Sequence, residues 1–449
     1  MQKLIYSRRC IALCASATIT ATLFFPAAVF AEVSPESSKI QGEAITSRAG
    51  ELKTNTLLDD STTIDLHNDN TILRDVKVKK ADGAGQVSFG PISIWLGANI
   101  SYDVYNINDI YNYGNGGGGD AGQKTRHLEG TLRSRLQNWG EIKAQYDIEG
   151  VDWTDLYVRW VSRLTPRPYT ITVGNQKEPM GLAWLGGSTS ETAQEIATPV
   201  SAFGDWRSFG VRVHRAFNLG ATDRAFGFWK GDDAAVTTSL GVFTEDINNS
   251  NDTSLAVTGR ATAGRRKGDS SSHLGFAGSL RRARGNYDKV NFRPEIYEAD
   301  KITLARPDAD TLAIGALEAA HGSGPLQLQA EAYLANYAGE VDGYGAGGYV
   351  QVGWVVAGQG RTYQTDWGVL APIRPEGNAC VVEVFSRFSH TRGDDDVNGW
   401  NAYNSLTLGA NVYFRKITGS VNVLYSRARD RVEGEDDGFG VVARARFLF

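Results

Sequence analysis

The chain has 449 residues, 41% of them hydrophobic, and a mean hydropathy of −0.30. No stretch after residue 31 approaches the roughly 18 consecutive apolar residues that a membrane helix needs, which excludes a bundle of such helices. The formal net charge of −5 argues against nucleic acid as a partner. The 51 glycines and 10% aromatic content fit many short strands joined by tight turns.

Residues 1–31 are predicted to be a secretory signal peptide. Three cations near the start precede an apolar run that ends at Val29-Phe30-Ala31, a small-residue cleavage pattern, so Glu32 is expected to begin the mature chain. The alternative is an uncleaved membrane anchor. Loss of the signal cations takes the net charge from −5 to −8. Of the 3 cysteines only Cys380 remains, so neither an intrachain disulfide nor a cysteine metal site is expected.

Residues 32–87 are polar and are predicted to form a periplasmic leader, with a short strand around Arg74 to Lys79. From about Ser88 to Phe449, segments of about ten residues alternate apolar and polar side chains, the pattern of a tilted strand that crosses a membrane. In 141–149, for example, one face carries Ile142, Ala144, Tyr146 and Ile148, and the other carries Glu141, Lys143, Gln145, Asp147 and Glu149.

The end of the chain separates a membrane barrel from a soluble sandwich. The last strand places six apolar side chains on one face and ends on Phe449, which resembles the signal that outer-membrane barrels present to their assembly machinery. We therefore predict a transmembrane antiparallel β-barrel in the outer membrane over residues 88–449, with about sixteen strands. Unusually long connections at 218–235 and 358–378 leave this count open by two.

The connections partly alternate between short and long. Tight inner turns are predicted at Gln137 to Gly140, Leu164 to Pro168, Gly322 to Pro325 and Phe414 to Lys416. Long external loops are predicted at 106–124, 178–205, 282–310, 392–402 and 429–437.

The alternation also assigns charged side chains to the lumen of the barrel. The basic side chains on inward faces are Arg133, Arg135, Lys143, Arg159, Arg212, Arg260, Arg281, Arg444 and Arg446. The acidic ones are Glu129, Glu141, Asp147, Asp155, Glu331 and Glu383. Because arginine is a permanent cation whose donors match phosphate and carboxylate oxygens, this lumen favours anions. In the alternative, these cations pair with the acids and only satisfy a polar interior.

Other motifs give weaker signals. The glycine-rich stretch 114–122 lacks the spacing of a phosphate loop and is read as a flexible external loop. Acidic clusters at 394–396 and 433–437 are read as solvated loops, with divalent-ion bridging to lipopolysaccharide as the alternative. His127 and His214 fall on lumen faces without a recognisable catalytic partner, so no catalytic residue and no cofactor is predicted. A barrel enzyme and a non-conducting structural or adhesive barrel remain the alternatives to a channel.

Three stretches, in the same order, resemble the phosphate-selective porin O and P family. They are WGEIKAQYDIEGVDWTDLYVRW…YTITVGNQKEP from Trp139, GYVQVGWVVAGQGRTYQ at 348–364 and LTLGANVYF at 406–414. The resemblance implies a homotrimer of barrels with about sixteen strands and an inward-folded third external loop, here 178–205. It also implies a ladder of arginines leading anions to a constriction with cations and a nearby aspartate.

Residue by residue, Asp155 matches the aspartate and Arg126 a ladder arginine of the family. The constriction loop departs from the pattern, because Trp184 stands where a phosphate-binding lysine is expected and Ile196 where an arginine is expected. Lys177 and Arg207 flank the loop and partly substitute for these cations. The predicted anion-binding and pore-lining set is therefore Arg126, Arg133, Arg135, Asp155, Arg159, Lys177, Arg207 and Arg212. Passage of small anions, phosphate among them, is favoured over strict phosphate selectivity.

Overall fold

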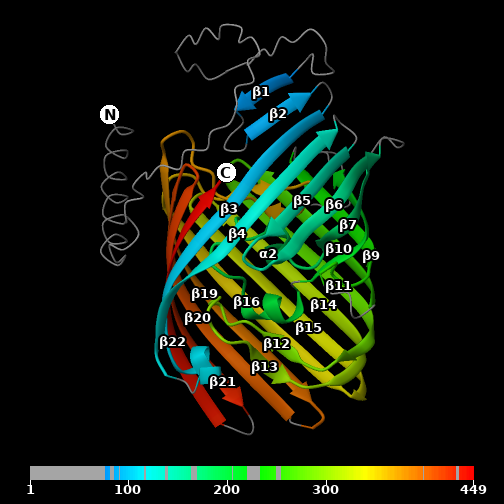
Figure 1. The fold of residues 1–449 in the computed structure, drawn as a ribbon, viewed down its shortest axis with the longest axis vertical. Coiled ribbons are helices and arrows are strands. Elements are labelled where there is room, and N and C mark those ends of the chain that lie inside the picture. The colour runs from blue at the N-terminus through cyan, green and yellow to red at the C-terminus, as the bar shows by residue number, and fades with distance from the viewer. Residues whose placement is uncertain are drawn as a thin grey trace, which may run out of the picture.

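Sixteen antiparallel strands close into one barrel in the computed structural model (Figure 1). The structure describes residues 76–80, 85–89, 92–115, 118–136, 140–162, 169–204, 206–219, 233–248, 254–397, 399–430 and 434–449. The barrel strands are β3 (Ile92–Ile107), β4 (Asp120–Leu136), β5 (Gly140–Asp147), β6 (Asp152–Ser162), β7 (Tyr169–Lys177), β8 (Arg207–Asn218), β9 (Ala234–Phe243), β10 (Leu255–Lys267), β11 (Ser270–Tyr287), β14 (Asp308–Ser323), β15 (Leu326–Val341), β16 (Gly343–Ala357), β19 (Cys380–Asp395), β20 (Gly399–Phe414), β21 (Ile417–Asp430) and β22 (Gly434–Leu448).

The first and last barrel strands close the sheet. β22 pairs with β3 from Gly440 opposite Ile107 to Leu448 opposite Asn99. Because this pairing removes the free edges, every strand has a partner on both sides, which a membrane requires. The predicted count of sixteen is confirmed. Ile92 and Phe449 lie near the same end, which we call the proximal end; the opposite end is the distal end (Figure 1).

The alternation of side chains is the one that the sequence predicts. On β16 the exposed fractions of Val350, Val352 and Trp354 are 57%, 41% and 48%, whereas the intervening Gln351 is buried. Most other strands repeat this pattern, with leucine, valine and phenylalanine outside and mainly polar side chains inside, although Leu312, Leu424 and Val442 also face inward. No described helix is long and apolar enough to span a membrane.

The connections differ from the prediction at two distal positions. The turns at Gly322 to Pro325 and Phe414 to Lys416 are tight, as predicted. The prediction of long loops at 392–402 and 429–437 is wrong. The pairing of β19 with β20 continues to Asp395 opposite Gly399, and that of β21 with β22 continues to Asp430 opposite Gly434, so both connections are short. The turns predicted near residues 137–140 and 164–168 lie mostly outside the described residues.

Three long connections pack against inward-facing side chains of the barrel strands, through contacts such as Gln194 with Ser420, Glu295 with Arg387 and Arg361 with Glu383. They are 178–206, with α2 (Leu182–Gly186) and α3 (Thr198–Phe203), 288–307, with β12 (Val290–Phe292) and β13 (Ile302–Ala305), and 358–379, with β17 (Tyr363–Gln364) and β18 (Val369–Leu370). The first two start at the distal end and share an apolar core with inward side chains such as Tyr333 and Tyr403. The third enters from the proximal end and packs Leu370 near Leu182 of α2. A short η1 (Asp109–Asn115) follows β3.

The predicted signal peptide 1–31 and most of the leader 32–87 lie outside the described residues. Within that leader, β1 (Val76–Lys80) and β2 (Gly85–Phe89) form a hairpin that extends the sheet beside the start of β3. The first strand of the closed barrel therefore begins at Ile92, a few residues after the predicted boundary.

Candidate functional site

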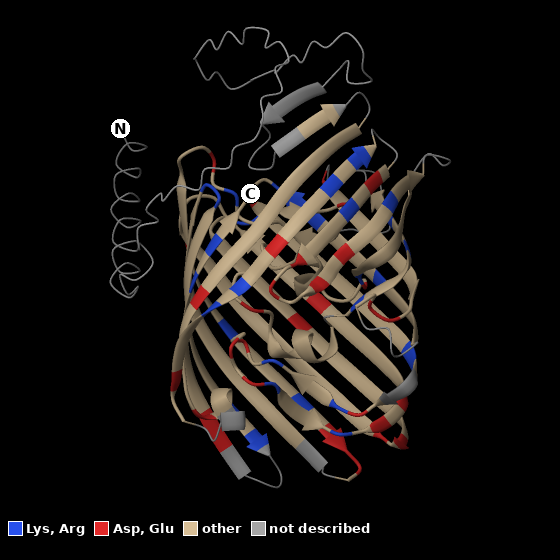
Figure 2. Ribbon diagram, viewed as in Figure 1, with Lys and Arg blue, Asp and Glu red and all other residues tan. Residues whose placement is uncertain are grey.

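One lumen cavity of about 1220 Å³ is lined by all eight residues of the predicted set. These are Arg126, Arg133, Arg135, Asp155, Arg159, Lys177, Arg207 and Arg212. Among the described residues, ten basic and five acidic side chains line this cavity. Basic and acidic positions are interleaved along the strands rather than separated onto different sides (Figure 2). The excess of cations around the cavity is therefore a local property in a chain that is acidic as a whole.

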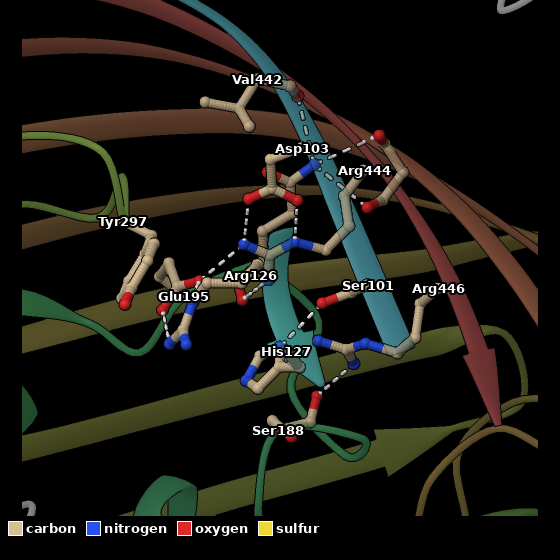
Figure 3. Close-up of polar contacts among 12 residues, drawn as sticks. Ser101, Asp103, Arg126, His127, Ser188, Glu195, Tyr297, Val442, Arg444 and Arg446 are labelled. Atoms are coloured by element: carbon tan, nitrogen blue, oxygen red, sulfur yellow. Dashed lines mark hydrogen bonds and ion pairs between the residues drawn. The ribbon is translucent and has the colours of Figure 1, made fainter. Parts of the chain in front are cut away.

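A β-bulge in β4 turns Arg126 into the lumen. Ser101 lies opposite His127 and Tyr102 opposite Thr125, so Arg126 is the extra residue. A bulge re-aims a side chain that strict alternation would send outward. The guanidinium donates to both carboxylate oxygens of Glu195, at 2.8 and 2.9 Å (Figure 3).

Glu195 joins this arginine to the opposite side of the seam where the barrel closes. Arg444 of β22 donates to Glu195 at 2.7 Å and to both oxygens of Asp103 at 2.5 and 2.6 Å (Figure 3). Burial raises the pKa of the Glu195 carboxyl, but Arg126 and Arg444 outweigh burial and hold this pKa well below its usual range. Charge is therefore balanced at this point, and Arg126 is a partnered cation.

Asp155 lies among cations on the cavity wall. Its carboxylate is 2.5 Å from Lys143 Nζ and 3.2 Å from Arg207 Nε. Lys177 Nζ donates to the Trp184 carbonyl at 2.6 Å. Two cations share one acid and a third is held by a neutral carbonyl, so this part of the wall keeps excess positive charge.

A second group of cations shares Glu141. Arg159 is 3.4 Å from this carboxylate, and the half-exposed Arg133 and Arg135 are 3.8 and 3.9 Å away. Exposed ion pairs of this length contribute little to the stability of the protein, so their cations stay available to a solute. Arg212 donates to the Lys177 carbonyl at 3.2 Å.

Other cations predicted for the lumen form buried ion pairs. For these residues, the alternative stated in the sequence analysis is correct: they pair with acids and satisfy a polar interior. Arg260 donates to Glu318 at 2.6 Å, and Arg281 is paired with Glu178. The same is true of Arg444, described above. These side chains hold the wall and its inner segments together rather than line the cavity.

Two acids next to the cavity have a reduced tendency to ionise. Burial raises the pKa of the Glu191 carboxyl, although Arg387 and Arg361 oppose the shift. Burial, together with the nearby Asp103, raises the pKa of Glu298 to about 7. Both residues belong to the inner segments.

Sequence reasoning missed the lining residues that the inner segments contribute. Tyr297 and Arg293 come from 288–307, and Trp367 and Arg374 come from 358–379. The unusual length of 358–378 was the available signal, but length does not tell where a loop folds. The described residues contain no group of three or more metal-ligating side chains.

A closed barrel with an apolar exterior and a charged internal cavity is the architecture of an outer-membrane porin. The family model for phosphate-selective porin O and P matches residues 117–449, and the chain belongs to this family. The protein is thus a porin of the outer membrane.

Solved structures of outer-membrane proteins resemble the fold. A loop L8 deletion mutant of OmpT from Vibrio cholerae matches with a TM-score of 0.49 and 9% identity, over 80% of this chain and 100% of that chain. An anion-selective porin from Comamonas acidovorans matches at 0.47 and 10%, over 80% and 100%. The channel DcaP of Acinetobacter baumannii matches at 0.45 and 10%, over 81% and 99%. No curated protein matches the chain.

Proposed function

We propose that this porin mediates passive diffusion of small hydrophilic solutes and prefers anions, phosphate among them. The observation that carries this proposal is the excess of ten basic over five acidic side chains around one cavity. Segment 178–206 lies across the lumen beside these cations and narrows the path. Diffusion along such a path needs neither turnover nor a cofactor.

We propose general anion passage rather than strict phosphate selectivity. The expected lysine and arginine of the constriction loop are Trp184 and Ile196. The cations nearest to Trp184 are Lys177 and Arg207, which come from the barrel wall. Lys177 is held by a carbonyl and Arg207 by Asp155, so neither forms the pair of loop cations that would strip water from phosphate.

The export, assembly and oligomeric state of the channel are also proposals. We infer that the signal peptide is removed after Ala31, that the barrel assembly machinery recognises the strand ending on Phe449, and that the mature chains form a homotrimer among outer-membrane lipid and lipopolysaccharide. We also propose that the lumen histidines are not catalytic. Ser101 and His127 are hydrogen-bonded at 2.8 Å, but both side chains are buried, and His214 is bonded to the Asp366 carbonyl at 2.8 Å.

Alanine at both Arg133 and Arg135 should lower chloride conductance about two- to threefold, because each exchange removes a cation that attracts anions, and water and salt screen these half-exposed charges. Single-channel recording of the purified protein in planar bilayers measures this change. Arg266→Ala is the matched control, since this half-exposed arginine pairs with Asp233 and does not line the cavity. An unchanged current in the double variant would place Arg133 and Arg135 outside the ion path and contradict the proposal.

A further inference from the structure

The cavity is lined by aromatic rings as well as cations, and the two kinds of side chain are paired. Distances from cation to ring centroid are 5.2 Å for Arg135 and Trp95, 4.2 Å for Lys177 and Trp184, 4.9 Å for Arg159 and Trp367, and 3.8 Å for Arg126 and Tyr297. All four rings belong to the lining, and each is partly exposed. The rings come from four segments, namely β3 and the three inner connections.

Trp184 is fixed in place. Its indole N–H donates to the Trp206 carbonyl at 3.0 Å. The buried carboxylate of Glu331 accepts from the backbone N–H groups of Leu182 and Ala183 at 2.5 and 3.1 Å, and so anchors the turn that carries the ring. The ring therefore lies beside Lys177 as a rigid apolar surface, at the position where a family member is expected to carry a lysine.

Trp367, on the inner segment that enters from the proximal end, is held by two side chains of the barrel wall. Buried Arg260 donates to the carbonyls of Trp367 and Gly368 at 3.2 and 2.7 Å. The indole stacks on His214, with centroids 4.4 Å apart and planes 8° from parallel. Because Arg159 lies 4.9 Å from the same ring, a planar surface and a cation are again presented together.

This pairing suits one class of solute better than others. A hydrated inorganic phosphate gains from the cations but nothing from the rings. A carboxylate attached to a flat apolar ring gains from both, since aromatic rings stack on one another and on guanidinium planes while the carboxylate meets the cation. A saturated ring of the same charge keeps the carboxylate contact and loses the stacking.

We propose that the channel preferentially binds and passes small organic anions with a planar apolar part, the class of aromatic carboxylates. The proposal rests on the proposed function, because it assigns the solute class of the same cavity. Trp184 and Trp367 are the specificity-determining rings. Trp184 stands where a phosphate-binding lysine is expected. This exchange lowers the affinity of the constriction loop for phosphate and raises its affinity for an aromatic anion.

Benzoate, cyclohexanecarboxylate and inorganic phosphate should be compared as inhibitors of chloride current through the purified protein in planar bilayers. We expect benzoate to reach half-inhibition at a concentration severalfold below those of the other two. Trp184→Leu and Trp367→Leu should each raise the benzoate value severalfold and leave the cyclohexanecarboxylate value unchanged. Trp354→Leu, at a ring on the lipid-facing surface, is the matched control and should change neither.

Equal half-inhibition by benzoate and cyclohexanecarboxylate in the unmodified protein would overturn the assignment of solute class. That comparison needs no variant, so it decides the matter even if one of the leucine variants does not fold. Chloride current without a preference for benzoate would refute this inference alone. Absence of chloride current in the unmodified protein would refute the proposed function as well.

Discussion

Exchange of Lys177 and Arg207 together for glutamine is expected to abolish most of the anion preference of the pore. Both cations line the cavity, and Arg207 is one of the two that neutralise Asp155. Without them the ten basic lining residues become eight against the same five acids. Each lost charge removes about 1 kcal/mol of attraction for an anion at about 4 Å in water, so anion occupancy should fall more than tenfold. Conductance and reversal potential in planar bilayers measure the effect.

The matched control exchanges two cations that lie away from the cavity, Arg282 and Lys289, for glutamine. Both are exposed, and their ion pairs are long, at 3.9 Å to Asp310 and 3.6 Å to Asp288. The control should keep the conductance and selectivity of the unmodified protein. If the two double variants behaved alike, only the net charge of the protein would matter, and the placement of Lys177 and Arg207 in the ion path would be wrong.

Glu295→Ala is expected to release segment 288–307 from the lumen and to enlarge the conductance. The buried carboxylate accepts from Arg387 at 3.0 Å, Ser389 at 2.5 Å and Thr407 at 2.7 Å, on β19 and β20 of the barrel wall. Loss of one partner of a buried ion pair costs about 3–5 kcal/mol because the other charge stays buried without compensation. Tyr297 of this segment lines the cavity, so its release should widen the path.

Two measurements check this expectation on the same preparation: the single-channel step in potassium chloride, and the temperature at which the folded band is lost in gel electrophoresis. The step should rise and the temperature should fall. Glu340→Ala, at an exposed acid near the distal end of β15, is the control and should alter neither. A Glu295→Ala protein with the conductance and heat resistance of the unmodified chain would show that this ion pair does not hold the segment.

The barrel itself was readable from the sequence because lipid outside and water inside impose a period of two on every strand. That period assigned Lys143, Asp155 and Arg159 to the inner wall, where the structure places them. It failed at Arg126, since a bulge shifts the phase of the alternation by one residue and leaves no mark in the pattern of polarity. Only the resemblance to the porin family pointed to that arginine.

The inner segments were beyond such reasoning. Their positions depend on contacts between residues far apart in the chain, such as Glu295 with Arg387 and Arg361 with Glu383. A polar loop that folds inward has the same composition as one that extends into water. The sequence therefore predicted the cations of the wall but not the rings of Tyr297 and Trp367 that face them.

The reversal potential of the unmodified protein in a tenfold gradient of potassium chloride tests the central claim most directly. An internal cavity with twice as many basic as acidic lining residues should admit chloride more readily than potassium. The potential at zero current should therefore shift from zero toward the equilibrium potential of chloride. A shift toward the equilibrium potential of potassium would contradict the account.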